Sequence, residues 1–556
     1  MKNHDRYAPI YFPPPAGEHI WTQKDHIEKP PVWCSVDLRD GNQSLVVPMS
    51  LEQKIDFFSY LVSLGFKEIE VGFPAASETE FETLHTLLDR GLVPPDVTLQ
   101  VLTQCRDHII KKTFDAIRGV PNCIVHFYNS VSRAQREQVF KKDKEEVKMI
   151  AVKAARLIKK LAAGREGNLR FQYSPESFTG TEPEYALEVC NAVLDILEPS
   201  AENNVIINLP STVQVSMPHI FANQIEYMSQ NLKYREHVTL SIHPHNDRGT
   251  GVAEAEMGIL AGAQRIEGTL FGNGERTGNV DIVTLAMNLY SLGVSPGLDF
   301  SDMPAVVEAY EQATGMQVGM RQPYAGALVF AAFSGSHQDA IAKGAEWHKQ
   351  QGLHRWAVPY LPIDPTDVGR VYETEVIRIN SQSGKGGIGY LLEQNFGYNL
   401  PPKMRESFGY AVKAISDHRH TELSPAQLKE IFEKKYLDIK QPLEISEIHF
   451  IQKNGIEASI TVCENGTTHK AAAIGNGRLD AVANALRQAT GNGYNILTYS
   501  EHALEVGSSS KAVAYVGLEW DNGTVTWGAG QHTDIIVASV SALVSAYNNH
   551  IETEGE

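Results

Sequence analysis

Three things are scarce in this sequence of 556 residues: cysteine, net positive charge and long apolar runs. The cysteines number five, an odd and scattered set, so reduced buried thiols are favoured over a disulfide framework or a cysteine metal site. No apolar run approaches the ~20 residues that a membrane-spanning helix needs, and the N-terminal residues lack the apolar core of a signal peptide. These absences predict a cytoplasmic protein that does not span a membrane.

The charge balance excludes another class of function. Acidic residues outnumber basic ones by 67 to 49, which gives a formal charge of -18. Nucleic acids and anionic membranes both attract basic surfaces, so neither is an expected partner. The hydrophobic content of 42% is ordinary for a globular protein, and the chain length predicts three or four structural units.

Strand-like runs alternate regularly with helix-like runs from residue 32 to residue 292. Eight such pairs fit into about 260 residues, the usual size of a (β/α)8 TIM barrel. A doubly wound open sheet is the alternative, but its first turn would be rich in glycine, whereas 37–43 reads Asp-Leu-Arg-Asp-Gly-Asn-Gln. The predicted strands are 32–36, 68–71, 97–102, 123–127, 169–173, 205–208, 238–242 and 265–270. The predicted helices are 52–64, 78–88, 107–117, 144–161, 183–197, 219–231, 252–263 and 281–292.

Polar and ionisable side chains follow most of the predicted strands. In a barrel of this kind the carboxyl ends of the strands meet at one rim, where active sites lie. Ordinary polar loops would not concentrate acids, arginines and histidines so heavily at one end, so the rim is the predicted active site. The segments concerned are 37–43, 72–74, 126–130, 174–176, 208–212, 243–247 and 272–279.

Within this rim, His243 and His245 follow the seventh predicted strand, and side chains two residues apart in a strand point to the same side. With Asp40 after the first strand they form a two-histidine, one-carboxylate set that leaves positions open for water and substrate. Asn279 can add a neutral oxygen. These ligands suit a divalent metal, Mg²⁺ or Mn²⁺ first, with Zn²⁺ as a further candidate. A pair of solvated loop histidines is the alternative.

Such a metal can hold a 2-oxo acid through its carboxylate and keto oxygens and polarise the ketone for attack. Arg39, next to Asp40 in the sequence, would then stabilise the alkoxide that develops.

Three motifs, in this order, carry a resemblance to a known family. They read Leu-Arg-Asp-Gly-Asn-Gln at 38–43, His-Pro-His-Asn-Asp at 243–247 and Gly-Asn-Gly-Glu-Arg-Thr-Gly-Asn at 272–279. Together they resemble the DRE-TIM metallolyase superfamily and, within it, the long, leucine-regulated 2-isopropylmalate synthase family, over essentially the whole chain. The sequence departs from the superfamily pattern after the second strand, where 72–74 stands in place of the expected glutamate. Glu70 precedes this segment inside the strand, and no role is assigned to it.

The resemblance implies a Claisen-type condensation of acetyl-CoA with 3-methyl-2-oxobutanoate, which gives 2-isopropylmalate and CoA in the first committed step of leucine synthesis. It places Glu176 and Thr212 around the oxo acid and Glu275 near the thioester, and it adds Asn246 and Gly274 to the substrate-binding set. From the residues alone, Glu176 could instead cap the next helix, and Thr212 could be a turn residue.

Residues 306–438 break the strand and helix rhythm. A helix is predicted to open at 335–340, and 358–365 is a proline-stiffened extended segment. The resemblance implies that this linker covers the active site of the partner in a homodimer. His337 would then be the general base, helped by Glu176, and Tyr360 would complete the catalytic set. A surface histidine on a helix is the alternative for His337.

A second pattern begins at about residue 439 and repeats internally. Gly475 and Gly477 precede one predicted helix, and Gly528 and Gly530, 53 residues further on, precede another. Two βββα units related by pseudo-symmetry are the predicted fold. The glycines could let a ligand carboxylate approach backbone N–H groups, or they could allow strand and helix to pack closely. The resemblance favours the first explanation and implies a leucine-sensing domain in which paired subunits hold the ligand.

The predicted organisation is an N-terminal arm (1–30), the barrel (31–305), the linker (306–438) and a C-terminal α+β regulatory domain (439–556). Two other functions stay open. A citramalate or homocitrate synthase would share the motifs and take another oxo acid, and a non-catalytic amino-acid-binding regulatory protein would keep only the fold. The intact set of Asp40, His243 and His245 argues against the last, because a dead barrel needs no metal ligands.

Overall fold

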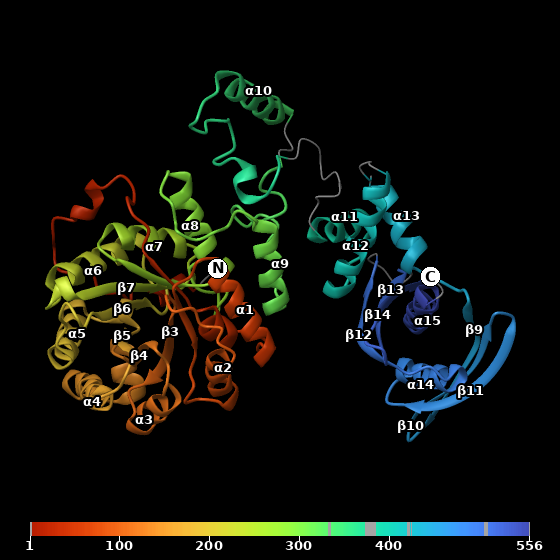
Figure 1. Cartoon of the computed structure of the whole chain (residues 1–556), viewed down its shortest axis with the longest axis horizontal. Coiled ribbons are helices and arrows are strands. Elements are labelled where there is room, and N and C mark those ends of the chain that lie inside the picture. Colours follow the sequence, from red (N-terminus) through yellow and green to blue (C-terminus); the bar gives the residue numbers. More distant parts are fainter. Residues whose placement is uncertain are drawn as a thin grey trace. The chain divides into compact units, whose positions relative to one another are not determined.

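The computed structural model describes residues 3–331, 335–372, 385–419, 423, 425–504 and 510–554. The chain divides into two compact units. The first comprises Met1–Phe330 and Asp339–Tyr372, and the second comprises Ala331–Gln338 and Glu373–Glu556. Figure 1 shows the barrel of the first unit and the two sheets of the second.

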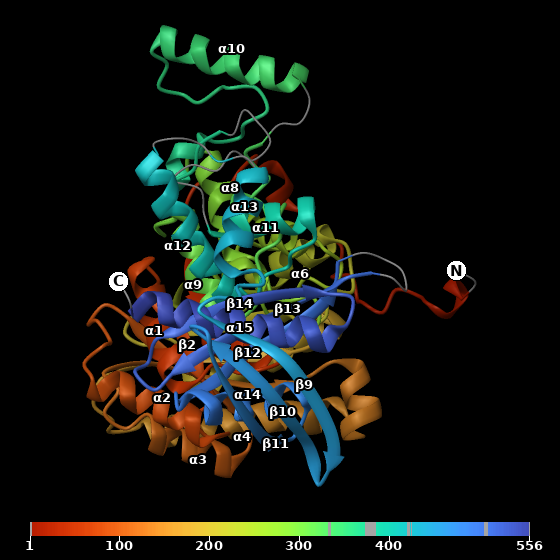
Figure 2. The ribbon, with the colours of Figure 1, turned by 90° about the vertical axis from the view of Figure 1, so that its right-hand side faces the viewer.

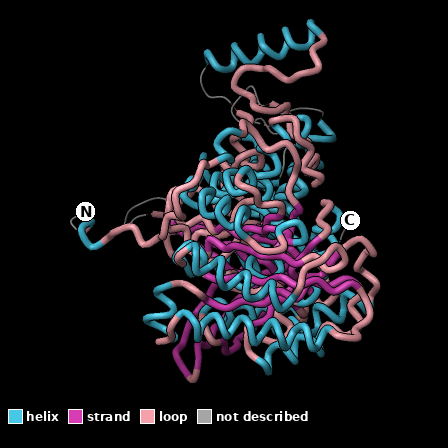
Figure 3. The backbone as a smooth tube through the Cα atoms, turned by 90° about the vertical axis from the view of Figure 1, so that its left-hand side faces the viewer, coloured by secondary structure: helices cyan, strands magenta, loops and turns pink. Residues whose placement is uncertain are grey.

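The first unit is built on a closed barrel of eight parallel strands, which pair in chain order, with β8 beside β1. The predicted (β/α)8 fold is confirmed, and the doubly wound alternative is wrong. In Figure 3 the barrel strands, in magenta, are covered by helices, in cyan. The strands are β1 (Val32–Ser35), β2 (Glu68–Gly72), β3 (Thr98–Gln104), β4 (Asn122–Ser130), β5 (Asn168–Glu176), β6 (Val205–Ser211), β7 (Val238–Pro244) and β8 (Arg265–Gly268). The helices are α1 (Leu51–Ser63), α2 (Glu78–Asp89), α3 (Asp107–Ala116), α4 (Lys144–Ala162), α5 (Pro183–Leu197), α6 (Pro218–Asn231), α7 (Gly251–Leu260) and α8 (Ile282–Ser291).

Local sequence signals set where the barrel helices begin. Ser50 and Asp143 cap α1 and α4 in capping boxes, in which the side chain of Gln53 or Glu146 accepts the backbone N–H of the cap residue. α5 begins at Pro183, whose fixed φ suits the first helical position. Apolar side chains then fill the space between helices and strands, and those that are fully buried include Phe58, Phe66, Leu84, Ile110, Ile158, Val193 and Phe221.

The inside of the barrel is polar. Alternate residues of a strand face the same side, and on β2 and β8 these alternate residues are Glu68 and Glu70, and Arg265 and Glu267. All four are buried. Arg265 forms ion pairs with Glu68 and, at 2.9 Å, with Glu267, so each of these two acids has a cation beside it. Buried charges are tolerated when they are paired in this way.

The N-terminal arm lies along α6. The backbone N–H of Trp21 donates to Glu226 and its indole N–H donates to Asn223, each at 2.9 Å. After the barrel come α9 (Met303–Thr314) and α10 (Gly335–Gln351), and α10 begins where the sequence predicts a helix. The second unit contains α11 (Lys385–Phe396), α12 (Pro402–Arg419) and α13 (Pro425–Tyr436). The predicted limits of the arm, the barrel, the linker and the regulatory domain remain predictions.

The C-terminal part of the second unit contains two three-stranded antiparallel sheets, each followed by a helix, which confirms the two predicted βββα repeats. Figure 2 shows α14 against the first sheet and α15 against the second. The first repeat consists of β9 (Leu443–Lys453), β10 (Gly455–Glu464), β11 (Thr467–Gly475) and α14 (Arg478–Thr490). The second consists of β12 (Tyr494–Ala503), β13 (Ala512–Trp520), β14 (Val525–His532) and α15 (Ile535–Glu554).

All five cysteines are free: Cys34, Cys123 and Cys190 are buried, and Cys105 and Cys463 are partly exposed. Burial raises the pKa of Cys123 to about 12, which keeps its thiol protonated and suits it to packing. Within the ranges given above, no helix is long and apolar enough to cross a lipid bilayer.

Candidate active site

A tight turn after β1 carries two of the predicted site residues. The turn, Asp37–Gly41, is π-helical, and the Asp37 carboxylate holds it in place by accepting the N–H of Leu270 at 3.1 Å. Burial raises the pKa of Asp37 to about 7. The turn brings Arg39 and Asp40 together at the rim, with 2.9 Å between Nη1 of Arg39 and Oδ1 of Asp40.

His243 and His245 meet Asp40 across the rim. Nε2 of His243 lies 3.1 Å from Oδ2 of Asp40, and Nε2 of His245 lies 3.7 Å from the same oxygen. The three side chains are buried, and one potential ligand atom of each lies within 4.8 Å of the other two. Two imidazoles and a carboxylate at this spacing can surround a single divalent ion.

The electrostatics of the three groups suit a cation. Burial opposes the ionisation of Asp40, but the Arg39 guanidinium holds the pKa of Asp40 well below its usual range. Burial and the neighbouring His243 lower the pKa of His245 to about 4. Burial also disfavours a charged His243, but hydrogen bonds with Asp40 and Glu267 raise its pKa to about 9. A metal ion would have to displace that proton, because only a deprotonated ring nitrogen is a ligand.

Asn279 lies beside this group. Its backbone forms an antiparallel bridge with His245, and both polar atoms of its side chain are buried without a hydrogen-bond partner in the described part of the chain. A buried polar group left unpaired costs about 1–3 kcal/mol, and a ligand bound at this position would satisfy it. Gly274 packs on Asn279, since a Cβ at Gly274 would lie 2.9 Å from the Asn279 backbone nitrogen.

Glu70 has no role predicted from the sequence, but in the structure it holds Arg39. Its buried carboxylate accepts a hydrogen bond from Nε of Arg39 and contacts His126 and Gln100 at 2.7 Å each. Arg39 is therefore held between two acids, Asp40 and Glu70. The signal in the sequence is the alternation of acids in β2, where Glu68 and Glu70 flank an apolar residue.

Glu176 and Thr212 both reach the rim, because Glu176 ends β5 and Thr212 follows β6. The Ser130 hydroxyl donates to the Glu176 carboxylate, and Oγ1 of Thr212 accepts the N–H of Ser177 at 2.9 Å. The idea that Glu176 caps α5 is wrong, since Glu182 occupies the cap position.

Two further predicted residues are tied to rim loops. Oδ1 of Asn246 accepts the N–H of Gly251 at 2.8 Å, at the start of α7, so this side chain holds its own loop. The Glu275 carboxylate accepts the side-chain amide of Gln43 at 2.7 Å and is 46% exposed, which leaves it accessible to a ligand.

His337 and Tyr360 lie outside the barrel strands. His337 is exposed in the first turn of α10, and Tyr360 is exposed on the segment that follows this helix. His337 belongs to the second unit of the chain and Tyr360 to the first. Their predicted catalytic roles involve a partner subunit and stay predictions.

Known proteins match the chain from end to end. The HMGL-like family matches residues 30–309. A 2-isopropylmalate synthase of Desulfitobacterium hafniense (strain Y51) is 60% identical over 552 residues, which cover 99% of each chain. Those of Helicobacter hepaticus and Clostridium acetobutylicum are 57% and 53% identical, and the matches cover 99% and 95% of this chain and 100% and 96% of theirs. The chain belongs to the 2-isopropylmalate synthase family.

Two more family models match the part of the chain that follows the barrel. The post-catalytic domain of alpha-isopropylmalate synthase matches residues 327–393, and the LeuA allosteric (dimerisation) domain matches residues 422–551. The HMGL-like family uses a divalent metal, and the residues grouped around Asp40 fit one.

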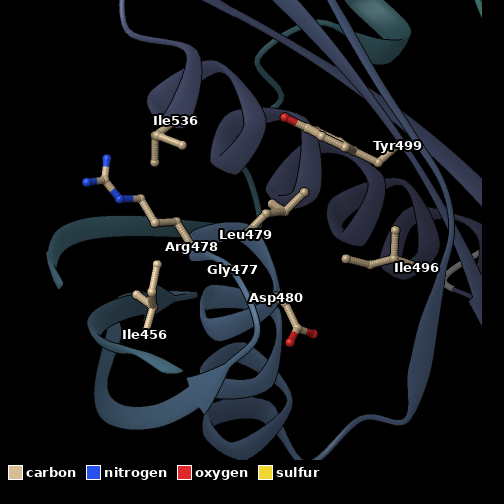
Figure 4. A pocket seen from close by; sticks show the side chains of 8 residues that line it. All are labelled: Ile456, Gly477, Arg478, Leu479, Asp480, Ile496, Tyr499 and Ile536. Atoms are coloured by element: carbon tan, nitrogen blue, oxygen red, sulfur yellow. The ribbon is translucent and has the colours of Figure 1, made fainter. Parts of the chain in front are cut away.

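A pocket of about 600 Å³ opens within the LeuA domain (Figure 4). Gly477 and Asp480, at the start of α14, form one side of it. Ile456, Ile496 and Ile536, from β10, β12 and α15, give it an apolar wall. Backbone N–H groups at a helix start and an apolar wall together suit a small amino acid with a branched side chain.

Of the four predicted regulatory glycines, Gly477 lines this pocket, and a Cβ at Gly477 would meet no atom within 4 Å. The other three lie against a helix backbone, which a Cβ would approach to 2.2 or 2.3 Å. Gly475 faces α14 in this way, and Gly528 and Gly530 face α15. Close packing of strand and helix therefore explains these three glycines.

Proposed function

We propose that this chain catalyses the condensation of acetyl-CoA with 3-methyl-2-oxobutanoate and water to 2-isopropylmalate and CoA. The observation that carries the proposal is the group of Asp40, His243 and His245 at the barrel rim with Arg39 beside it. The full-length match to proteins named 2-isopropylmalate synthase supports this choice of substrates over those of citramalate or homocitrate synthases.

We assign Asp40, His243, His245 and Oδ1 of Asn279 as ligands of a divalent cation, with Mg²⁺ as the first candidate and Mn²⁺ or Zn²⁺ as alternatives. When bound, the cation supplies a Lewis acid for the ketone of the oxo acid. Arg39, fixed between Asp40 and Glu70, provides a permanent positive charge where negative charge develops on the oxygen of this ketone.

The proton transfers need a base that removes a methyl proton from the thioester. We assign this role to His337 of the partner in a homodimer, with Glu176 assisting it and Tyr360 completing the set. The LeuA dimerisation domain supports the homodimer. The residues proposed to bind the two substrates are Thr212, Asn246, Gly274 and Glu275.

A thiol-release assay tests the proposed reaction. Purified full-length protein with acetyl-CoA should release CoA fastest with 3-methyl-2-oxobutanoate, lose this activity with a chelator, and regain it with added Mg²⁺. Preference for pyruvate would indicate a citramalate synthase, and preference for 2-oxoglutarate would indicate a homocitrate synthase. No metal-dependent thiol release with any of the three would favour the non-catalytic regulatory protein.

We further propose that leucine inhibits the enzyme by binding in the pocket beside Gly477. The carboxylate of leucine would meet the N–H groups at the start of α14, and its side chain would meet the isoleucine wall. Inhibition requires leucine to bind one state of the enzyme more tightly than the other. Rates measured with leucine and, as a control, with alanine test this. An unchanged rate at saturating leucine, together with no binding in calorimetry, would contradict it.

A further inference from the structure

Glu267, on β8, is fully buried, and both oxygens of its carboxylate are used. Oε1 accepts hydrogen bonds from Gln100, Gln172 and Arg265 at 2.8, 2.7 and 2.9 Å. Oε2 contacts Nδ1 of His243 at 2.8 Å and accepts the side-chain amide of Asn208 at 3.2 Å. One carboxylate thus connects five side chains of the barrel interior, and one of them is a proposed metal ligand.

The other partners of Glu267 decide where the hydrogen of its contact with His243 lies. Its two oxygens already accept N–H groups from Gln100, Gln172, Arg265 and Asn208, and Arg265 forms an ion pair with it at 2.9 Å. A carboxylate surrounded by donors in this way only accepts hydrogen bonds, so Nδ1 of His243 carries the hydrogen. In the neutral imidazole the other nitrogen, Nε2, then has the free lone pair, and Nε2 is the atom that faces Asp40.

The contact between the ring nitrogen Nδ1 and a buried carboxylate distinguishes His243 from His245. Nδ1 of His245 is buried and has no hydrogen-bond partner among the residues that the structure describes. The two histidines therefore differ in what holds them, although both face the same oxygen of Asp40.

A second metal site around Glu267 is the competing explanation. Glu267, Glu70 and His126 are close enough together to ligate one ion. However, the side-chain amide of Gln100 donates to both carboxylates, at 2.7 and 2.8 Å, and Arg39 pairs with Glu70. These N–H donors lie where a cation would need free oxygens, so this group is a hydrogen-bonded network.

We propose that Glu267 is a positioning residue that fixes the tautomer and the ring orientation of His243, so that Nε2 of His243 presents its lone pair to a metal held with Asp40. The inference rests on the proposed function only in assigning a metal to the group around Asp40. Carboxylates that orient metal-binding histidines in this way are typically worth 10- to 100-fold in metal affinity, about the effect expected here.

Glu267→Gln in the full-length protein is the central test. Three N–H donors face Oε1, so the amide oxygen of the glutamine should take that position and its NH2 should face His243. The NH2 group would donate to Nδ1, and the hydrogen of the imidazole would move to Nε2. Titration with Co²⁺ alone, followed by its visible absorption and by calorimetry, should show an affinity about 10- to 100-fold lower and a changed spectrum.

Glu68→Gln is the matched control. Glu68 is buried inside the barrel and pairs with the same Arg265, but its ion-pair partners are Arg265 and Arg170 and not His243. Its replacement should change Co²⁺ affinity by less than about threefold. An equal loss in both variants would overturn the proposal, because it would show that matching the charge of Arg265 is all that Glu267 does.

A double variant tests whether Glu267 acts through His243. In a His243→Asn background, Glu267→Gln should lower the remaining Co²⁺ affinity by less than about threefold, and a full additional loss would overturn the proposal. If circular dichroism shows that Glu267→Gln is unfolded, Glu267→Asp keeps the charge and withdraws the oxygen from His243, and unchanged Co²⁺ affinity in that variant would overturn it. A wild-type protein that binds no Co²⁺ would overturn the metal site itself, which is a distinguishable result.

Discussion

The interiors of the two units are built from different chemistry. Inside the barrel, Glu70, Arg265 and Glu267 are fully buried, and each has a charged neighbour of opposite sign. In the LeuA domain, the buried cluster around Tyr494 and Trp520 consists of alanine, valine, leucine, isoleucine and aromatic side chains. One interior is a network of directional contacts, and the other is apolar packing.

This difference indicates what each interior is for. A buried ion pair seldom stabilises a fold more than apolar side chains of the same size would, but it does fix orientation. In the barrel the network reaches Arg39 and His243, two residues to which we assign the proposed chemistry. In the LeuA domain, apolar packing holds two sheets and two helices together, and the buried Asn548 side chain adds hydrogen bonds to the backbone of Ile439 and Leu443. We therefore expect barrel variants to affect activity first and LeuA variants to affect stability or regulation first.

The largest expected effect is on the barrel side of this comparison. Asp40→Asn removes the carboxylate that faces both histidines and keeps the shape of the side chain. The rate of CoA release should fall by about 10³, because a Lewis acid is worth several kcal/mol and about 1.4 kcal/mol is a factor of ten. Asp195→Asn, which alters a surface ion pair with Lys233, is the control and should leave the rate unchanged. A rate within tenfold of the wild type for Asp40→Asn would contradict the expectation that barrel variants affect activity first.

The next largest effect tests the apolar side. A Cβ at Gly530 would lie 2.2 Å from the carbonyl oxygen of Ala538 and 2.6 Å from the nitrogen of Ala542, both in the backbone of α15. Gly530→Val should therefore force α15 away from β14 and lower the free energy of unfolding of this domain by about 3 kcal/mol in urea denaturation. Gly477→Ala, with open space around its Cβ, should cost less than about 1 kcal/mol. Equal losses would mean that close packing is not what Gly530 provides.

The barrel could be predicted from periodicity alone. Each predicted strand overlaps an observed one, because eight apolar runs separated by helix-length segments fit few other folds. The largest differences lie at the carboxyl ends, where β4, β5 and β6 continue to Ser130, Glu176 and Ser211. These extensions carry polar residues that the hydrophobic pattern assigns to loops, and the polar residues are there because the strands end at the rim.

The candidate site could be predicted only in part. Asp40 and His243 could be grouped because each lies near the end of a strand, and closure of the barrel brings the strand ends together. Glu70 and Glu267 lie within strands, and some of their partners come from strands far away in the sequence: His126 on β4 contacts Glu70, and Gln100 on β3 donates to Glu267. An alternating acid in a strand looks like a solvent-facing residue until the barrel closes and turns that face inwards. The use of Gly530 likewise depends on the distance to a helix, which no local pattern contains.

A smaller effect concerns the pocket beside Gly477 and tests whether a LeuA variant alters regulation without altering activity. Ile496→Ala removes part of the apolar wall of this pocket, while Ile451, on β9, is about half exposed and lies outside it. The lost contact is worth about 1.4 kcal/mol, so half-inhibition should need about tenfold more leucine, and the uninhibited rate should not change. Ile451→Ala is the matched control and should inhibit normally. A lower uninhibited rate in Ile496→Ala would show that the two interiors do not act independently.

The smallest expected effect comes from Glu254, a buried acid on α7 that has no ion-pair partner in the described residues, unlike Glu68. Its carboxyl group accepts hydrogen bonds from the Ser211 hydroxyl at 3.3 Å and the Gln214 amide at 3.1 Å. Burial raises the pKa of Glu254 to about 8, far above the ordinary value of 4.5. The folded protein therefore keeps a proton that the unfolded chain has already released between these two pH values.

Stability should accordingly fall as the pH rises through this window, because the folded state binds more protons than the unfolded state does. Between pH 7 and pH 8 the loss from this one group should be about 1 kcal/mol in the free energy of unfolding. Glu254→Gln cannot titrate, so its free energies of unfolding at pH 7 and pH 8, from urea denaturation, should differ less than those of the wild type by that amount. Glu68→Gln should not flatten the profile. Burial opposes ionisation of Glu68, but Arg265 and Arg170 hold its pKa below the usual value, so it stays ionised in this range. If both variants flattened it equally, an ion pair inside the barrel would protect an acid from titration no better than two hydrogen bonds do.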